Sequence, residues 1–150
     1  MSPLSGPKTY KINSRIIAQA ASGTADASIG EAEAAGTVTA VTFTPDANIT
    51  GATATKRTIT LENRGQDGSG STVVATLDLV TGVNPVKHDE YAFTLSGTAA
   101  NLNVAAGDVL VVKEAVTSTG TANPGGRIEV SIARGEVGAE PPFRAAPSVP

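Results

Sequence analysis

The chain has 150 residues, a formal net charge of −3, a pI of about 5.1 and no cysteine. The absence of cysteine excludes a disulfide framework and any cysteine-ligated metal site. Lysine and arginine are scattered through an acidic chain, which argues against a nucleic-acid-binding protein, since such proteins need a basic surface. No apolar run approaches the roughly 20 residues of a membrane span, and the N-terminus lacks the pattern of a secretory signal. We therefore expect neither nucleic acid nor membrane as a partner.

The two ends of the chain differ from its middle. Residues 1–7 contain two prolines and a glycine and are predicted to form an N-terminal arm. Residues 134–150 contain four prolines, which cannot donate hydrogen bonds to a sheet, and are predicted to form a proline-rich C-terminal tail. A β domain is expected over residues 8–133, with its core in residues 36–133.

The first predicted strand begins at Thr9 and extends towards Gln19. Tyr10, Ile12 and other residues at every second position would share one face of this strand, the pattern of a half-buried strand. The segment 18–35 is rich in alanine, glycine and serine, and we expect it to be a loop.

The middle of the chain repeats one unit, a threonine- and valine-rich strand followed by a turn. The expected strands cover residues 37–44, 52–62, 72–81, 91–95, 109–115 and 127–132. Alternation predicts that Val41 and Phe43 share a face with Thr37 and Thr39, and that Glu62 points outward. It also predicts that Val73, Ala75, Leu77 and Leu79 share one face. The run 109–112 is apolar on both faces, which is typical of a central strand. The loop 63–71 is predicted to be the most flexible one and could contact a partner.

Seven or eight short strands at regular spacing predict an all-β protein. The expected architecture is a β-sandwich or a jelly-roll/barrel-like domain with extended N- and C-terminal arms. Aromatic residues make up only 3% of the chain, so the core must consist mainly of Val, Ile, Leu and Ala. We therefore expect modest stability and some reliance on contacts with partners.

No group of residues predicts catalysis or metal binding. His88, the only histidine, stands beside two carboxylates on a predicted turn, where neighbouring side chains diverge and form a poor ligand set. Segments beginning at Asp46 and Asp67 resemble fragments of calcium loops but lack the acidic density that such loops need. No nucleophile-elbow motif is present. We expect no enzyme activity, no cofactor and no metal.

The stretch 36–133 resembles the head decoration, or capsid cement, proteins of tailed bacteriophages. The resemblance lies in the segments AGTVTAVTFTP (35–45), RTITLENRG (57–65), GSTVVATL (70–77), FTLSGTAANLNVAAGDVL (93–110) and NPGGRIEVSI (123–132). It implies a β-rich module bound outside the major capsid protein, often as a trimer at three-fold positions, without enzyme activity.

The sequence thus favours a structural virion protein, synthesised in the host cytoplasm, that lies on the outer capsid surface and stabilises contacts between major capsid protein subunits. Its expected partners are the major capsid protein and its own copies in a homotrimer. Residues expected to contact the capsid or a neighbour lie in or beside the arms, and they are Pro3, Leu4, Pro7, Tyr10, Pro141, Pro142, Phe143 and Arg144. For Phe143, anchoring in a neighbour's pocket and a tail with no role for this ring stay open as alternatives. Alternative functions are a tail-tube or head-fibre subunit, for which the loop 63–71 could supply an exposed hairpin, and a host-glycan binding module, against which the scarcity of aromatics counts.

Overall fold

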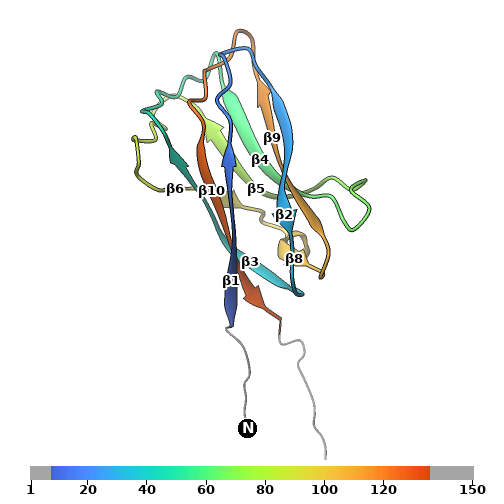
Figure 1. Cartoon of the computed structure of the whole chain (residues 1–150). Helices are drawn as coiled ribbons and strands as arrows, with labels where there is room; N and C mark the ends of the chain where they lie inside the picture. Colours follow the sequence, from blue (N-terminus) through green and yellow to red (C-terminus); the bar gives the residue numbers. More distant parts are fainter. Residues whose placement is uncertain (1–7, 136–150) are drawn as a thin grey trace, which may run out of the picture.

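The computed structural model describes residues 8–135, which form an all-β domain without α-helices (Figure 1). Seven strands have seven to ten residues and three have two. The elements are β1 (Thr9–Ile16), β2 (Ala25–Glu31), β3 (Gly36–Pro45), β4 (Arg57–Asn63), β5 (Thr72–Leu79), β6 (Tyr91–Ala92), β7 (Thr94–Leu95), the 3-10 helix η1 (Ala99–Leu102), β8 (Asn103–Val104), β9 (Val109–Val116) and β10 (Gly126–Arg134). Within the described range, no helix has the length and apolar character needed to cross a membrane.

The strands form two antiparallel sheets, so the predicted fold class is confirmed. One sheet has the order β1-β10-β3-β6, with β8 also paired to β3, and the other has the order β2-β9-β4-β5-β7. One of the two sheets curls into a half-barrel. The buried side chains of both sheets form one hydrophobic core, which includes Phe43, Ile59, Leu110 and Ile132.

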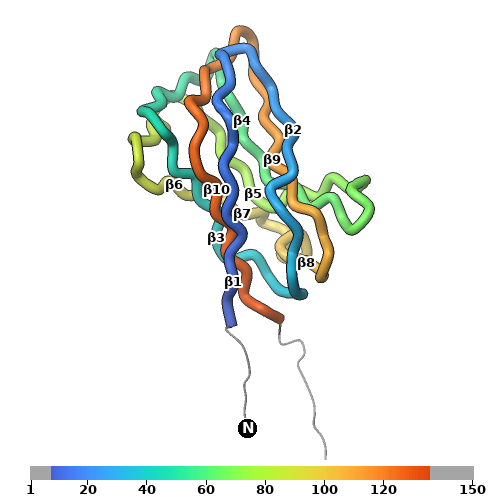
Figure 2. Tube along the Cα trace, in the orientation of Figure 1, coloured from blue at the N-terminus to red at the C-terminus, as the bar shows by residue number. Residues whose placement is uncertain are grey.

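The last two long strands of the chain are central strands. β10 lies between β1 and β3, and β9 lies between β2 and β4 (Figure 2). Sheet formation therefore depends on pairs that are far apart in sequence, such as Thr9 with Ala133. The predicted central strand at 109–112 is confirmed, because Leu110, Val111 and Val112 are all buried although they alternate between the two faces of β9.

Two β-bulges change the side-chain positions predicted from simple alternation. In β3, the register shifts opposite Ser131 and Ile132, so that both Val38 and Val41 are buried, whereas Thr39 and Ala40 between them are exposed. The expectation that Thr37 and Thr39 share the face of Val41 is wrong, because a bulge inserts one extra residue and reverses the alternation.

The second bulge lies between β4 and β5, where the register shifts at Leu61 and Glu62. Here Val74 is buried and Val73 is 39% exposed, so the prediction that Val73 shares the face of Ala75, Leu77 and Leu79 is wrong. Glu62, predicted to point outward, is buried at 6% exposure, and its carboxylate accepts a 2.7 Å hydrogen bond from Nε of Arg64, whose side chain covers it.

The segment 18–35, predicted to be a loop, contains strand β2. Its residues are mostly small or polar and have low intrinsic β-propensity, which is why the sequence pattern hid it. The strand forms because the adjacent β9 pairs with it from Ala25 to Glu31. Its side chain Ile29 enters the core.

The segment 91–96 passes from one sheet to the other. Its Tyr91 pairs with Phe43 of β3, whereas Thr94 pairs with Thr76 of β5. Phe93, between these two pairs, is buried, and its amide donates to the carbonyl oxygen of Val41. This crossing closes one side of the sandwich.

A buried ion pair lies at the end of the sandwich where β1 ends and β10 begins. Arg57 is fully buried, and its Nη1 donates a 2.8 Å hydrogen bond to Oε1 of Glu114, which is 2% exposed. The same carboxylate oxygen accepts a 2.8 Å bond from the amide of Asn123. The remaining guanidinium nitrogens donate to the backbone carbonyls of Thr121 and Ala20. The pair therefore joins β4 and β9 to the β1–β2 loop and the β9–β10 loop.

Replacement of Glu114 by glutamine is expected to destabilise the domain by about 3–5 kcal/mol, since it leaves the Arg57 charge buried without a counter-charge. Urea unfolding measures the effect. Glu129→Gln is the matched control, because it removes an ion pair of similar length, 3.0 Å, to a Lys11 side chain that is 55% exposed. The control should cost less than about 1 kcal/mol. Equal losses in the two variants would contradict the structural importance of the buried pair.

Candidate functional site

The two ends of the described chain lie side by side at one end of the sandwich. The antiparallel pairing of β1 with β10 begins at Thr9 and Ala133. The amide of Arg134 donates to the carbonyl oxygen of Lys8 at 2.7 Å, and the amide of Gly135 donates to that of Ala35 at 3.0 Å. The described chain therefore begins and ends at neighbouring points, at the end of the sandwich opposite the loop between β1 and β2 (Figure 2). We call this end, formed by residues 8–10, 32–36 and 133–135, the terminal face.

Within the terminal face, Tyr10 of β1 holds the turn between β2 and β3 in place. Its ring belongs to the hydrophobic core and is 8% exposed, and its hydroxyl donates a 2.6 Å hydrogen bond to the carbonyl oxygen of Ala34. Burial raises the pKa of Tyr10 above its ordinary value of 10.0. The side chain thus makes its contacts inside its own domain, which differs from the neighbour contact expected from the sequence.

Gly36 allows β3 and β10 to meet closely at the same face. A Cβ atom at this position would lie 2.3 Å from the carbonyl oxygen of Ala133 and 2.8 Å from Cγ2 of Ile132. No side chain fits at such distances without movement of the backbone. Glycine at this position is therefore a requirement of the strand packing that holds the two ends of the domain together.

Seven of the eight expected contact residues lie outside the described residues, and they are Pro3, Leu4, Pro7, Pro141, Pro142, Phe143 and Arg144. For these residues the contact stays a prediction. The structure brings together the points from which their two segments start, which the sequence pattern did not predict. These two points come together because β1, the first long strand, pairs with β10, the last one. No local sequence pattern indicates a pair of strands so far apart in the chain.

The outer faces of both sheets are polar. Threonines of β3, β4, β5 and β7 point outward, together with charged residues such as the exposed Lys11 and Arg127. The large hydrophobic side chains that are exposed within residues 8–135 are Ile17, Val73 and Val86, and they belong to three separate segments. Scattered single residues of this kind do not form an interaction patch.

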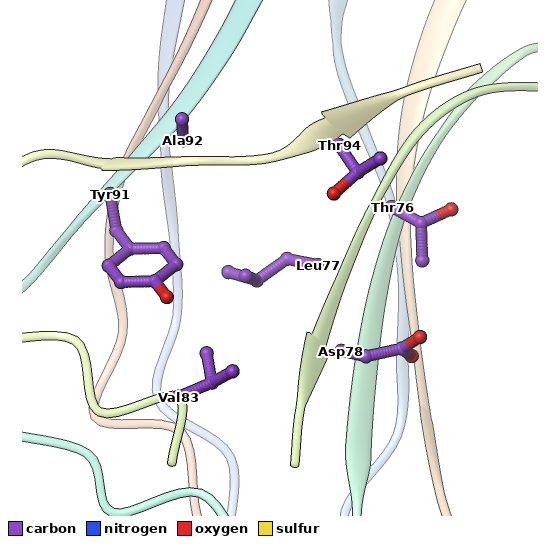
Figure 3. Close-up of a pocket in the computed structure, with 7 residues that line it drawn as sticks. All are labelled: Thr76, Leu77, Asp78, Val83, Tyr91, Ala92 and Thr94. Atoms are coloured by element: carbon purple, nitrogen blue, oxygen red, sulfur yellow. The ribbon is translucent and has the colours of Figure 1, made fainter. Parts of the chain in front are cut away.

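A pocket of about 490 Å³ opens where the segment 91–96 crosses between the sheets. It is lined by Thr76, Leu77, Asp78, Val83, Tyr91, Ala92 and Thr94 (Figure 3). The side chain of Leu77 points toward the ring of Tyr91, and Val83 lies below both, whereas the carboxylate of Asp78 points away from these three side chains. The lining is therefore mixed, because Leu77, Val83 and the ring of Tyr91 supply apolar groups, whereas Thr76, Thr94 and the one charged residue, Asp78, supply polar ones.

The structure places the other residues that the sequence analysis considered in turns. His88 has a φ of 63° in an exposed turn, and its amide donates to the carbonyl oxygen of Pro45. Oδ1 of Asp67 accepts bonds from the amide and the hydroxyl of Ser69, which lower the pKa of this carboxyl. Between residues 8 and 135, no three His, Cys, Asp or Glu side chains are grouped so that they could hold a metal ion.

The loop 63–71 is held at its base, although it was predicted to be the most flexible loop. Nε2 of Gln66 donates to the carbonyl oxygen of Ala106 at 2.9 Å, and the amide of Arg64 donates to that of Val109 at 2.8 Å. β4 ends at Asn63 and β5 starts at Thr72, so the loop is irregular and does not extend as a paired hairpin (Figure 1).

Tyr10→Phe is expected to lower the free energy of unfolding by about 0.5–1.5 kcal/mol at pH 8, because it removes the hydroxyl bonded to Ala34. The raised pKa of Tyr10 means that the unfolded chain loses this proton first when the pH rises above about 10. Above that pH the free energy of unfolding of the wild type should fall, so that its difference from that of Tyr10→Phe becomes smaller. Chemical denaturation at pH 8, 10 and 11 measures this difference. A difference independent of pH would contradict the assignment.

Gly36→Ala is expected to destabilise the domain by about 1–3 kcal/mol, because the added methyl group overlaps the backbone of Ala133. Gly97→Ala is the matched control, since a Cβ at Gly97 would meet no atom within 4 Å. The control should change stability by less than about 0.5 kcal/mol. Thermal unfolding of the two variants gives the comparison, and similar losses would show that Gly36 has no special role.

A comparison of the sequence with models of known protein families finds none that matches, and a comparison with curated proteins finds no relative.

Proposed function

We propose that this protein is a structural virion protein that binds the outside of a tailed-bacteriophage capsid and stabilises contacts between major capsid protein subunits. The observation that carries the proposal is the terminal face, where two proline-containing segments start from neighbouring strands of a domain with a buried core. Two segments that start together can reach adjacent subunits while the sandwich stays outside the shell.

The distribution of apolar residues supports attachment through these segments. The outer sheet faces are polar, whereas the arms contain Leu4 and Phe143 among prolines. Each arm residue that becomes ordered on binding costs about 1–2 kcal/mol of backbone entropy, so the arms need apolar anchors to offset this cost. Proline reduces the cost, because its φ angle is already fixed.

Many copies on one shell make a modest single-site affinity sufficient. A homotrimer at a three-fold position of the capsid would present three pairs of arms at once, and simultaneous engagement raises the overall affinity without any new type of contact. The proposed location is the outer capsid surface of the virion, after synthesis in the host cytoplasm. The proposed role requires no catalysis and no cofactor.

Cosedimentation with mature capsids that lack the protein tests the proposal. The full chain should bind saturably, and electron cryomicroscopy of the pellet should show density at three-fold positions. Variants without residues 1–7 or without residues 136–150 should bind at least about tenfold more weakly if each segment carries one apolar anchor. Full binding by both truncated variants would overturn the role of the arms.

The control for these truncations is thermal unfolding, because an intact sandwich must remain in each variant. Lack of binding by the full chain, together with rings or tubes formed by the protein alone, would instead support a tail-tube subunit. A glycan array measures the remaining alternative, and specific binding of a glycan would overturn a purely structural role.

A further inference from the structure

We propose that the pocket beside Tyr91 binds the segment Pro141-Pro142-Phe143-Arg144 of a second copy of this chain. The inference concerns self-association alone and holds whether or not the protein binds a capsid. It assigns one partner to the pocket and to the C-terminal segment.

The pocket exists because a strand leaves one sheet for the other. β7 pairs with Ala75 and Thr76 only, and β5 continues beyond this pairing to Leu79. The space next to Leu77 is therefore not filled by a neighbouring strand. It is bounded instead by the half-buried ring of Tyr91 and by Val83 (Figure 3).

The shape and chemistry of the pocket suit an aromatic side chain beside proline. An aromatic ring placed between Tyr91 and Leu77 would contact a ring on one side and an aliphatic chain on the other. Proline-containing segments commonly bind to surfaces that present aromatic rings, since their backbone is already extended. Phe143 is the only aromatic residue outside residues 8–135, and two prolines precede it.

The negative charge of Asp78, at the edge of the pocket, is opposite in sign to that of Arg144, the residue after Phe143. Asp78 is the one charged residue that lines the pocket, and 46% of its side chain is exposed. Its Oδ1 accepts a 2.7 Å bond from Thr58 and lies 3.7 Å from Nζ of Lys56. The exposed part of this carboxylate points away from Leu77, Val83 and Tyr91, so a cation would meet it outside the pocket (Figure 3). Arg144 directly follows Phe143 and would lie at this edge when the phenyl ring occupies the interior.

The geometry favours a second copy over the chain's own tail. Tyr91 is paired with Phe43, which is paired with Ile128, so the pocket is level with Ile128. From Ile128 to Arg134, β10 extends by about 20 Å, and β6 lies two strand spacings, about 10 Å, to the side of β10. The straight distance from Arg134 to Tyr91 is therefore about 22 Å. Residues 136–143 span at most about 29 Å when fully extended. β10 also runs away from the pocket, so the chain's own tail would have to reverse its direction within this length.

Complementation between two full-length variants tests the inference. Phe143→Ala removes the anchor and leaves the pocket open. Thr94→Trp places a large ring in the pocket from an exposed position, because the side chain of Thr94 lies on the same side of its strand as Leu77 and Tyr91 (Figure 3). Val149→Ala is the control for a general effect of changes in the tail. Thermal unfolding confirms that each variant retains the fold.

Sedimentation equilibrium over a range of protein concentrations provides the measurement. The wild type and Val149→Ala should show the same rise in average mass with concentration. Phe143→Ala and Thr94→Trp should each need at least about tenfold higher concentration for that rise. An equimolar mixture of the two should recover part of the association, because the tail of Thr94→Trp can enter the pocket of Phe143→Ala.

Amide NMR signals of Leu77, Val83 and Thr94 in the full chain distinguish the remaining outcomes. Signals that shift with protein concentration in the wild type, but not in Phe143→Ala, support the inference. Signals changed by Phe143→Ala at every concentration would show that the chain's own tail fills the pocket, which overturns the role of a second copy. An unchanged mass and unchanged signals in both variants would overturn the inference entirely, as would a wild type that does not self-associate.

Discussion

The buried ion pair between Arg57 and Glu114 is the constraint on which the arrangement of the two sheets depends. Arg57 donates hydrogen bonds to a carboxylate of β9 and to carbonyl groups of two loops that cross between the sheets. Asn123 bonds the same carboxylate, and its backbone forms a two-way bridge with Gln19. A buried pair of this kind adds little net stability relative to apolar packing, yet the loss of one partner is costly. The pair therefore fixes the paths of the crossing loops.

The position of these loops determines how the ends of the sandwich differ. At the Arg57 end, the β1–β2 and β9–β10 loops are tied to sheet strands by charged and amide groups. At the terminal face, strands β1 and β10 end together through backbone bonds, a tyrosine hydroxyl and a close approach at Gly36. The loops at the Arg57 end hold β1 and β10 in register, and this register places Thr9 beside Ala133 at the terminal face.

The fold is completed only when the C-terminal strands arrive. β9 and β10 lie in the middle of the two sheets, so neither sheet can form its full set of pairs before the last quarter of the domain is present. Such non-local pairing implies slow folding compared with helical proteins of the same size. The central strands are each paired on both edges, so their backbone groups are bonded within the sheets.

Alternation of apolar and polar residues determined the fold class, the stripe of Tyr10 and Ile16 in β1, and the central position of β9, because a strand's side chains alternate whatever its partner is. The same alternation also places Arg57 on the inward face with Ile59 and Leu61, which is the signal by which this buried charge could have been found. Of the candidate site, the sequence indicated the two proline-containing ends. The tertiary structure decided the rest.

Pairing with β9 made a strand of β2. One bulge separated Thr37 and Thr39 from the face of Val41, and the other separated Val73 from the face of Ala75. Pairing of β1 with β10 brought the two ends together, and the crossing of 91–96 opened the pocket. These features share one physical reason. A strand's partner, and the register between them, is selected by residues that are distant in sequence, and a local pattern contains no information about that choice.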